Sequence, residues 1–216
     1  GEKFLMSKWR PSKQNLYVIP DIHGHAFCLD SILKRILPLK KKDQIIFLGD
    51  YVDRGPNSKK VIQTLIDLKE SYKDRITILL GNHEFFMLWS CGLWEEKEIN
   101  PFELTPFSVW MQNGAIQTIL SYQNIDVKEI FSIKQSKVKS VIDSDHVRFL
   151  KKHGKLFHET DEYIFVHAGC DPFLPLEDQS DDILLWDRSL YEFIIKMPKG
   201  SEPSWEKTVI CGHNYD

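Results

Sequence analysis

The stretch "QIIFLGDYVDRG", residues 44–55, decides how this chain is interpreted, because an apolar run leads directly into charged side chains. The run "QIIFLG" is apolar at consecutive positions, which is typical of a parallel strand covered on both faces. Asp50, Asp53 and Arg54 follow where that strand would end. Ligands of α/β sheets gather beyond the carboxyl ends of the strands. The stretch therefore indicates an α/β fold with its chemistry at a strand end.

Four other short runs share this apolar composition and predict further strands. They are "NLYVIP" (15–20), "RITILLG" (75–81), "EYIFVHAG" (162–169) and "TVICG" (208–212). Two helical patterns separate the early strands. "DSILKRILPL" (30–39) would place Ile32, Leu33, Ile36 and Leu37 on one side, and "NSKKVIQTLIDLKE" (57–70) would begin at Asn57 or Ser58. The first 80 residues thus predict a parallel strand–helix–strand–helix–strand unit.

The composition argues against several classes of protein. In 216 residues, 28 basic and 31 acidic side chains give a net charge of −3, which provides no electrostatic basis for binding nucleic acid or an anionic membrane. No apolar run approaches the ~20 residues of a membrane span, and the first residues show no signal-peptide pattern. The four cysteines form no CxxC pair. We expect reduced, mostly buried thiols and a cytoplasmic protein.

Residues suited to metal binding or proton transfer follow every predicted strand. They are Asp21 and His23; Asp50, Asp53 and Arg54; Asn82, His83 and Glu84; His167; and His213. A turn or a helix cap is the simpler explanation of any one of these places. It does not explain why four of the eight histidines lie near the ends of predicted strands. If the strands lie side by side, these side chains converge on one cleft.

The candidate metal ligands are Asp21, His23, Asp50, Asn82, His167 and His213. Carboxylates, an amide and three imidazoles without a thiolate suit manganese, iron or zinc, but neither calcium nor a cysteine-rich structural zinc site. Six side chains exceed what one catalytic metal with an open position needs. They suit two divalent metal ions that share a bridging carboxylate and lower the pKa of a water. The usual target of such a pair is a phosphorus ester.

Five motifs, in this order, resemble those of the phosphoprotein phosphatase family of calcineurin-like metallophosphoesterases. They are "PDIHG" (20–24), "GDYVDRG" (49–55), "GNHE" (81–84), "VHAG" (166–169) and "GH" (212–213). Together with "LLWDR" (184–188), they are similar to the bacterial and phage branch, which includes bacteriophage lambda phosphatase. The resemblance spans residues 16–213, which is nearly the whole chain.

The resemblance implies a role for each matching residue. Asp21 and His23 would bind the first metal ion, Asp50 would bridge both ions, and Asn82, His167 and His213 would complete the second. His83 would protonate the leaving oxygen, and Asp53 would hydrogen-bond His83 and keep it charged. Arg54 and Arg188, with Asn82, would hold the phosphate. Manganese is the expected metal, with iron or zinc as alternatives.

Some of these residues have simpler interpretations. Asp53 and Arg54 could form only a turn salt bridge, and Arg188 could only pack beside Trp186. Glu84 is expected to be structural, in the first turn of the next helix, where an acid is favourable. The aromatic residues of 85–110 are expected in the core rather than at a substrate platform.

The implied fold is a four-layer α/β metallophosphoesterase β-sandwich flanked by helices. We expect one domain over residues 1–216, with a helical insertion at roughly 84–155. In the family, Thr-Pro and further strands usually follow the last histidine. Because Asn214 to Asp216 follow His213 here, the strands expected after 213 would be missing from this sequence.

The expected activity is that of a metal-dependent phosphatase acting on phosphoserine and phosphothreonine in proteins. A rival is symmetrical cleavage of dinucleoside tetraphosphates, by enzymes that usually vary "GDYVDRG" and lack the Glu after "GNH". An inactive scaffold would lack a ligand or His83, and none is missing. A nucleic-acid phosphodiesterase would need a basic groove, which the composition does not indicate. The expected partner is a phosphoprotein or phosphoester substrate, and the oligomeric state is open.

Overall fold

A parallel sheet with helical crossovers forms the first half of the fold. The computed structural model describes residues 14–94, 105–188 and 206–213. Strands β1 (Leu16–Ile19), β2 (Gln44–Phe47), β3 (Ile76–Leu79) and β4 (Gly154–Lys155) lie in this order, and each pairs in parallel with the next. Helix α1 (Ala26–Ile36) connects β1 to β2, and α2 (Ser58–Tyr72) with the short helix η1 (Lys73–Arg75) connects β2 to β3. The predicted parallel unit is confirmed.

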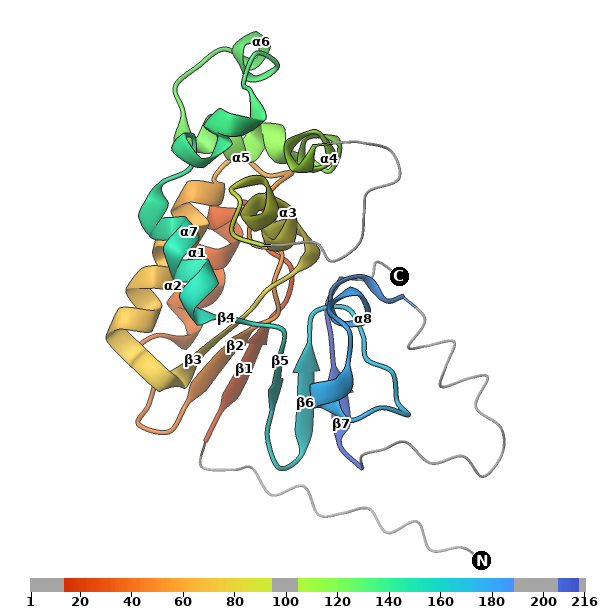
Figure 1. Cartoon of the computed structure of the whole chain (residues 1–216). Helices are drawn as coiled ribbons and strands as arrows, with labels where there is room; N and C mark the ends of the chain where they lie inside the picture. Colours follow the sequence, from red (N-terminus) through yellow and green to blue (C-terminus); the bar gives the residue numbers. More distant parts are fainter. Residues whose placement is uncertain (1–13, 95–104, 189–205, 214–216) are drawn as a thin grey trace, which may run out of the picture.

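The segment between β3 and β4 is helical, as predicted. It contains α3 (Asn82–Ser90), α4 (Pro106–Gln112), α5 (Ala115–Tyr122), α6 (Val127–Ile130), η2 (Gln135–Ser140) and α7 (Ser144–His153). Residues 95–104 of the predicted insertion lie outside the described residues. We call α4 to η2 the helical lobe. In Figure 1 the lobe lies beyond the end of the first sheet at which α3 begins.

A second sheet follows immediately. Strands β5 (Phe157–Glu159), β6 (Tyr163–Val166) and β7 (Thr208–Ile210) lie side by side, with β5 antiparallel and β7 parallel to β6. Between β6 and β7 the chain forms η3 (Leu176–Asp178) and α8 (Asp181–Trp186). Strands β4 and β5 are additions to the sequence-based prediction.

The two sheets and the helices form four layers. Ile46, Leu48 and Leu79 of the first sheet pack against Phe165 of the second. The outer face of the second sheet is covered by a small cluster that includes Leu184 of α8. On the other side, α1, α2 and α7 cover the first sheet (Figure 1). The mixed α/β fold expected from the sequence is confirmed.

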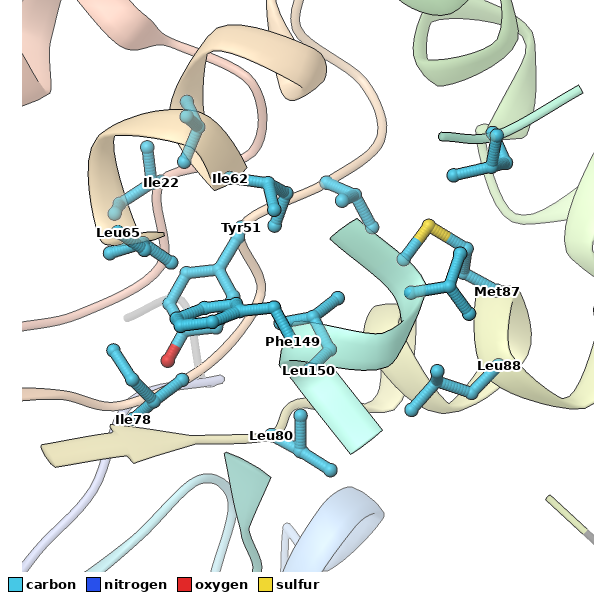
Figure 2. Packing of buried hydrophobic residues seen from close by; sticks show 14 of the residues in the cluster. Ile22, Tyr51, Ile62, Leu65, Ile78, Leu80, Met87, Leu88, Phe149 and Leu150 are labelled. Atoms are coloured by element: carbon cyan, nitrogen blue, oxygen red, sulfur yellow. The ribbon is translucent and has the colours of Figure 1, made fainter. Parts of the chain in front are cut away.

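The larger core lies between the first sheet and its helices. Figure 2 shows Ile62 and Leu65 of α2 and Leu150 of α7 in one cluster with Ile78 of β3 and the ring of Tyr51. Each of these side chains is at most 1% exposed. Successive residues of a strand face opposite sides of the sheet, and both sides are buried here. The strands therefore need apolar residues at consecutive positions. Among the described residues, no helix combines the length and apolarity of a membrane span.

Two sequence-based expectations are wrong in detail. Of the four residues predicted on one side of the first helix, Leu33 is buried and two pack against the core, whereas Ile32 is 42% exposed. Only two of the four free cysteines are buried, Cys91 and Cys170, whereas Cys28 and Cys211 are exposed. Burial raises the pKa of the Cys91 thiol to about 11 and that of Cys170 to about 12.

Candidate metal centre

The loops that leave β1 and β2 are locked together at the edge of the first sheet. The backbone N–H groups of Ile22 and His23 both donate to the carbonyl of Asp50, at 2.9 and 2.8 Å. The N–H of Gly24 donates to the carbonyl of Tyr51 at 2.8 Å. These bonds carry His23 to the side of Asp50, although the two residues come from different strands.

The backbone at this edge is strained where the predicted site residues lie. Six non-glycine residues in the described part of the chain have positive φ. Five of them are predicted site residues: His23, Asp50, Asp53, Arg54 and His213. Such conformations cost roughly 1–3 kcal/mol each and persist when the surrounding structure enforces them. The concentration of strain supports the assignment of this edge as the functional site.

The carboxylate of Asp50 lies at the centre of the site and is 2% exposed. One of its oxygens accepts a hydrogen bond from the backbone N–H of His83, at the start of α3 (3.2 Å). A Cβ atom at Gly81 would lie only 2.1 Å from the same oxygen, so this position requires glycine. Burial alone would raise the pKa of Asp50, but the imidazoles of His167, His83 and His23 outweigh it and lower that pKa below its ordinary value.

On one side of Asp50 lies His23. Its Nδ1 donates to the carbonyl of Val52 at 2.9 Å, which leaves the lone pair of Nε2 facing Asp50 Oδ2 at 3.4 Å. Burial lowers the pKa of His23, so the neutral, metal-binding form is favoured. This fixed tautomer is the arrangement found for ligating histidines.

On the other side of Asp50, four potential metal-ligand atoms converge. His167 Nδ1 donates to the carbonyl of Leu48 at 2.8 Å. Its Nε2 then lies 3.2 Å from Asn82 Oδ1, 3.1 Å from His213 Nδ1 and 3.5 Å from Asp50 Oδ1. Burial and the neighbouring His167 lower the pKa of His213 to about 4. Two imidazoles, an amide oxygen and a carboxylate that face one another form a donor set suited to a divalent cation.

Two groups of side chains could each hold a metal ion. The first is His23, Asp50 and His83, and the second is Asp50, His167 and His213. They share Asp50, which fits the expected bridging carboxylate. His213 Nε2 is buried and has no hydrogen-bond partner in the described part of the structure. The residues present therefore fit a pair of ions, although metal binding itself stays a prediction.

Asp21 lies at the margin of the site and belongs to neither group. Its Oδ1 accepts a hydrogen bond from the backbone N–H of His213 at 3.1 Å. A Cβ atom at Gly212 would come within 2.6 Å of that oxygen. Asp21 thus joins the end of β1 to the end of β7, and its predicted role as a ligand of the first metal stays a prediction.

The imidazole of His83 lies between the carboxylate of Asp53 and the guanidinium of Arg54. Its Nδ1 donates to Asp53 Oδ2 at 2.7 Å, as the sequence predicted, and both side chains are nearly inaccessible. Arg54 donates from Nη2 to His83 Nε2 at 3.1 Å and from Nη1 to His23 Nε2 at 3.0 Å. Arg54 therefore contacts the nitrogen atom from which His83 would protonate the leaving oxygen, and the charged state expected of His83 stays a prediction.

A cavity of about 180 Å³ opens over these residues. It is lined by Asp50, Arg54, Asn82, His83, Phe86, Asn113, Trp186, Arg188 and His213. The predicted phosphate-binding residues Arg54, Arg188 and Asn82 thus face the same space as the candidate metal ligands. A larger hollow of about 850 Å³ between α2 and α7 contains none of the predicted site residues. We therefore place the candidate site in the smaller cavity.

Glu84 has a larger role than a first-turn acid. Its buried carboxylate accepts hydrogen bonds from the N–H groups of Asp50 (2.7 Å), Tyr51 (2.8 Å), Val52 (3.2 Å) and Gly81 (3.0 Å). Burial and the nearby Asp50 raise the pKa of Glu84, while these N–H groups act in the opposite direction. Glu84 thereby fixes the loop that carries Asp50. The motif "GNHE" showed that an acid was present, but it did not show which loop the acid contacts.

The calcineurin-like phosphoesterase family matches residues 15–214, which include every predicted site residue. The chain belongs to this family. Its resemblance to the bacterial and phage branch stays a prediction.

Three comparisons show what this chain is similar to. It is 29% identical over 163 residues to "Bis(5'-nucleosyl)-tetraphosphatase, symmetrical" of Nitrosomonas europaea, covering 74% of this chain and 47% of that protein. The chain thus spans about half the length of this curated relative. A structure described as a putative diadenosine tetraphosphatase aligns with TM-score 0.52 at 18% identity, over 93% of this chain and 79% of the other. A Saccharomyces cerevisiae serine/threonine phosphatase aligns with TM-score 0.47 at 20% identity, over 82% and 47%.

Proposed function

We propose that this phosphoesterase is a two-metal phosphomonoesterase that hydrolyses phosphoserine and phosphothreonine in proteins. The observation that carries the proposal is the buried Asp53–His83 pair beside the cavity, with Nδ1 and Oδ2 2.7 Å apart. An alkoxide from serine or threonine is a strongly basic leaving group and must be protonated as it departs. A positioned imidazole supplies that proton. A nucleoside diphosphate is a much weaker base, so its departure gains far less from an acid.

The remaining side chains support the same reaction. Asp21, His23 and Asp50 would hold one ion. Asp50, Asn82, His167 and His213 would hold the other. When bound, such ions supply Lewis acidity toward the phosphoryl oxygens and lower the pKa of water. Arg54 and Arg188 face the cavity and would bind the phosphate oxygens through their paired N–H groups. Asp53 would stabilise the imidazolium of His83 until Nε2 gives its proton to the leaving oxygen.

A second candidate function is symmetrical hydrolysis of dinucleoside tetraphosphates. It is favoured by the activity for which the Nitrosomonas europaea relative and one similar structure are named. That relative shares less than half of its length with this chain. In the cavity, Phe86 and Trp186 offer an aromatic wall on which a base could stack.

A substrate panel separates the two functions. With manganese added, kcat/KM is measured for a phosphothreonine peptide, a phosphotyrosine peptide and diadenosine tetraphosphate. We expect the phosphothreonine peptide to have the highest value. A higher value for diadenosine tetraphosphate, unchanged in His83→Asn, would overturn the phosphatase proposal in favour of the second candidate. The native metal is addressed by repeating the panel with iron and zinc.

A further inference from the structure

The carboxylate of Asp53 receives more hydrogen bonds than its pairing with His83 requires. Trp110 Nε1 of α4 donates to both of its oxygens, at 2.9 and 3.1 Å. The hydroxyl of Thr118 in α5 donates to Oδ1 at 2.7 Å. Asp53, Trp110 and Thr118 are 0% exposed and His83 is 1% exposed. Water therefore cannot replace any of these donors.

Thr118 also holds the backbone of Asp53. Its Oγ1 accepts the N–H of Asp53 at 2.7 Å and lies 2.9 Å from Ser58 Oγ. Asp53 has a φ of +70°, a conformation that costs energy for a residue other than glycine. A single side chain thus fixes both the strained backbone of Asp53 and the rotation of its carboxylate.

The helical lobe also supports the neighbouring Arg54. The N–H of Arg54 donates to the carbonyl of Gly114 at 3.3 Å. Gly114 has a φ of +104°, and a Cβ atom there would lie 3.3 Å from Arg54 Cγ. The turn between α4 and α5 therefore lies directly against the loop that carries Asp53 and Arg54.

We propose that Trp110 and Thr118 are positioning residues for the Asp53–His83 pair, so that the helical lobe sets how well the leaving group is protonated. A buried carboxylate is stable as an anion only when donors satisfy its lone pairs. Trp110 and Thr118 satisfy those that His83 does not use. They thereby hold Oδ2 in line with His83 Nδ1, and this bond orients Nε2 toward the cavity. The proposal rests on the proposed acid role of His83, not on which phosphoester is the natural substrate.

Two variants remove one donor each, with nearly unchanged volume at Thr118 and a smaller ring at Trp110. Trp110→Phe deletes the indole N–H, and Thr118→Val replaces the hydroxyl by a methyl group. Thr118→Ser keeps the hydroxyl and loses only a methyl group. Ile119→Val is the packing control, because Ile119 is equally buried in α5 and its side chain has no polar atom. Thermal unfolding establishes that each variant folds, and if Trp110→Phe does not fold, Thr118→Val carries the test.

The first measurement is the dependence of kcat/KM on the leaving group, using p-nitrophenyl phosphate and phenyl phosphate with manganese. Loss of a hydrogen bond to a charged group predicts a fall of about tenfold to hundredfold on phenyl phosphate in Trp110→Phe and Thr118→Val. The fall on p-nitrophenyl phosphate should be several times smaller, because that leaving group needs little protonation. Thr118→Ser should return the ratio of the two substrates toward the wild-type value, and Ile119→Val should not alter it.

The second measurement needs no activity. Proton NMR of the metal-free protein reports the His83 Nδ1–H, whose short bond to Asp53 predicts a strongly low-field resonance. We expect that resonance to shift or broaden in Thr118→Val and Trp110→Phe and to persist in Ile119→Val. Equal losses on both esters together with an unchanged resonance would overturn the proposal and leave a structural role. A preference for diadenosine tetraphosphate would overturn the proposed function alone, since neither measurement depends on that substrate.

Discussion

The two halves of the candidate metal centre share Asp50 but differ in what faces it. In the first half, Arg54 donates to Nε2 of both His23 and His83, so the chain itself supplies a cation. In the second half, His167 Nε2 faces acceptor or ambivalent atoms of Asn82 and His213. The first half comes from loops of the parallel sheet and α3, whereas His167 and His213 follow strands of the second sheet.

This difference predicts unequal affinity for metal. An ion that binds His23 must displace the Arg54 guanidinium from the same nitrogen atom. An ion in the second half instead relieves the crowding of lone pairs around His167. We therefore expect the second half to bind the first equivalent of manganese and the first half to bind the second.

The largest effect should come from Asp50→Asn, which affects both halves at once. We expect turnover to fall by more than the roughly 10–100-fold that removal of an outer-shell partner costs, with binding of both ions weakened. Activity assays and calorimetric titration with manganese check this. Asp67→Asn, an exposed change in α2, is the control. Retained binding of two ions would show that the halves do not share Asp50.

His83→Asn should act on the first half alone. Loss of a general acid predicts a fall in kcat of about 10²–10⁴ on an alkyl phosphate and a smaller fall on p-nitrophenyl phosphate. The affinity of the variant for the second equivalent of manganese is measured by calorimetry in parallel. Equal losses on the two esters would contradict the acid role and assign His83 to the metal site instead.

Arg54→Met should make the two halves more alike. Without the guanidinium, manganese no longer displaces hydrogen bonds from a charged group, so affinity in the first half should rise by about tenfold. Calorimetry without substrate isolates this gain from the expected loss of phosphate binding. Arg75→Met, which removes an exposed contact to the carbonyl of Lys40, is the matched control. If Arg54→Met binds the second equivalent of manganese with unchanged affinity, Arg54 does not compete with the metal ion.

The smallest expected effect is that of His213, in the second half, on how the free energy of unfolding depends on pH. His213 has a pKa of about 4 in the folded protein and 6.5 as an ordinary imidazole. Between these values the unfolded chain binds more protons, so the free energy of unfolding falls as pH drops from about 6.5 to about 4. Above that window the stabilisation is complete. Denaturant titrations of the metal-free protein should show a weaker pH dependence in His213→Gln, and an equal dependence would contradict the assignment.

The elements found from the sequence were those with local patterns of sufficient length. The five consecutive apolar runs all became strands. Strands β4 and β5, with two and three residues, lie outside the five named runs because they are defined by pairing with β3 and β6 rather than by composition. On α1 only Ile32 was misplaced, because the predicted stretch 30–39 left out Ala26 and Leu29, which the helix buries.

The candidate site was predictable only in part. Each motif places its ligand at a strand end, and the structure brings Asp50, Asn82, His167 and His213 together. The contacts of Asp53 with Trp110 and Thr118 had no local signal, because these residues lie 57 and 65 positions along the chain from Asp53. The Arg54 contacts with His23 and His83 were likewise invisible, since they depend on side-chain direction.

By itself, the sequence determined the parallel sheet, the order of the ligand-bearing loops and the family, because strand periodicity and short motifs are local properties of the chain. Only the tertiary structure decided that Glu84 fixes the Asp50 loop, that Arg54 bridges two imidazoles, and that the helical lobe reaches Asp53. The physical reason is that hydrogen bonds between distant segments depend on how buried layers pack, and packing is set by the whole core rather than by any one segment.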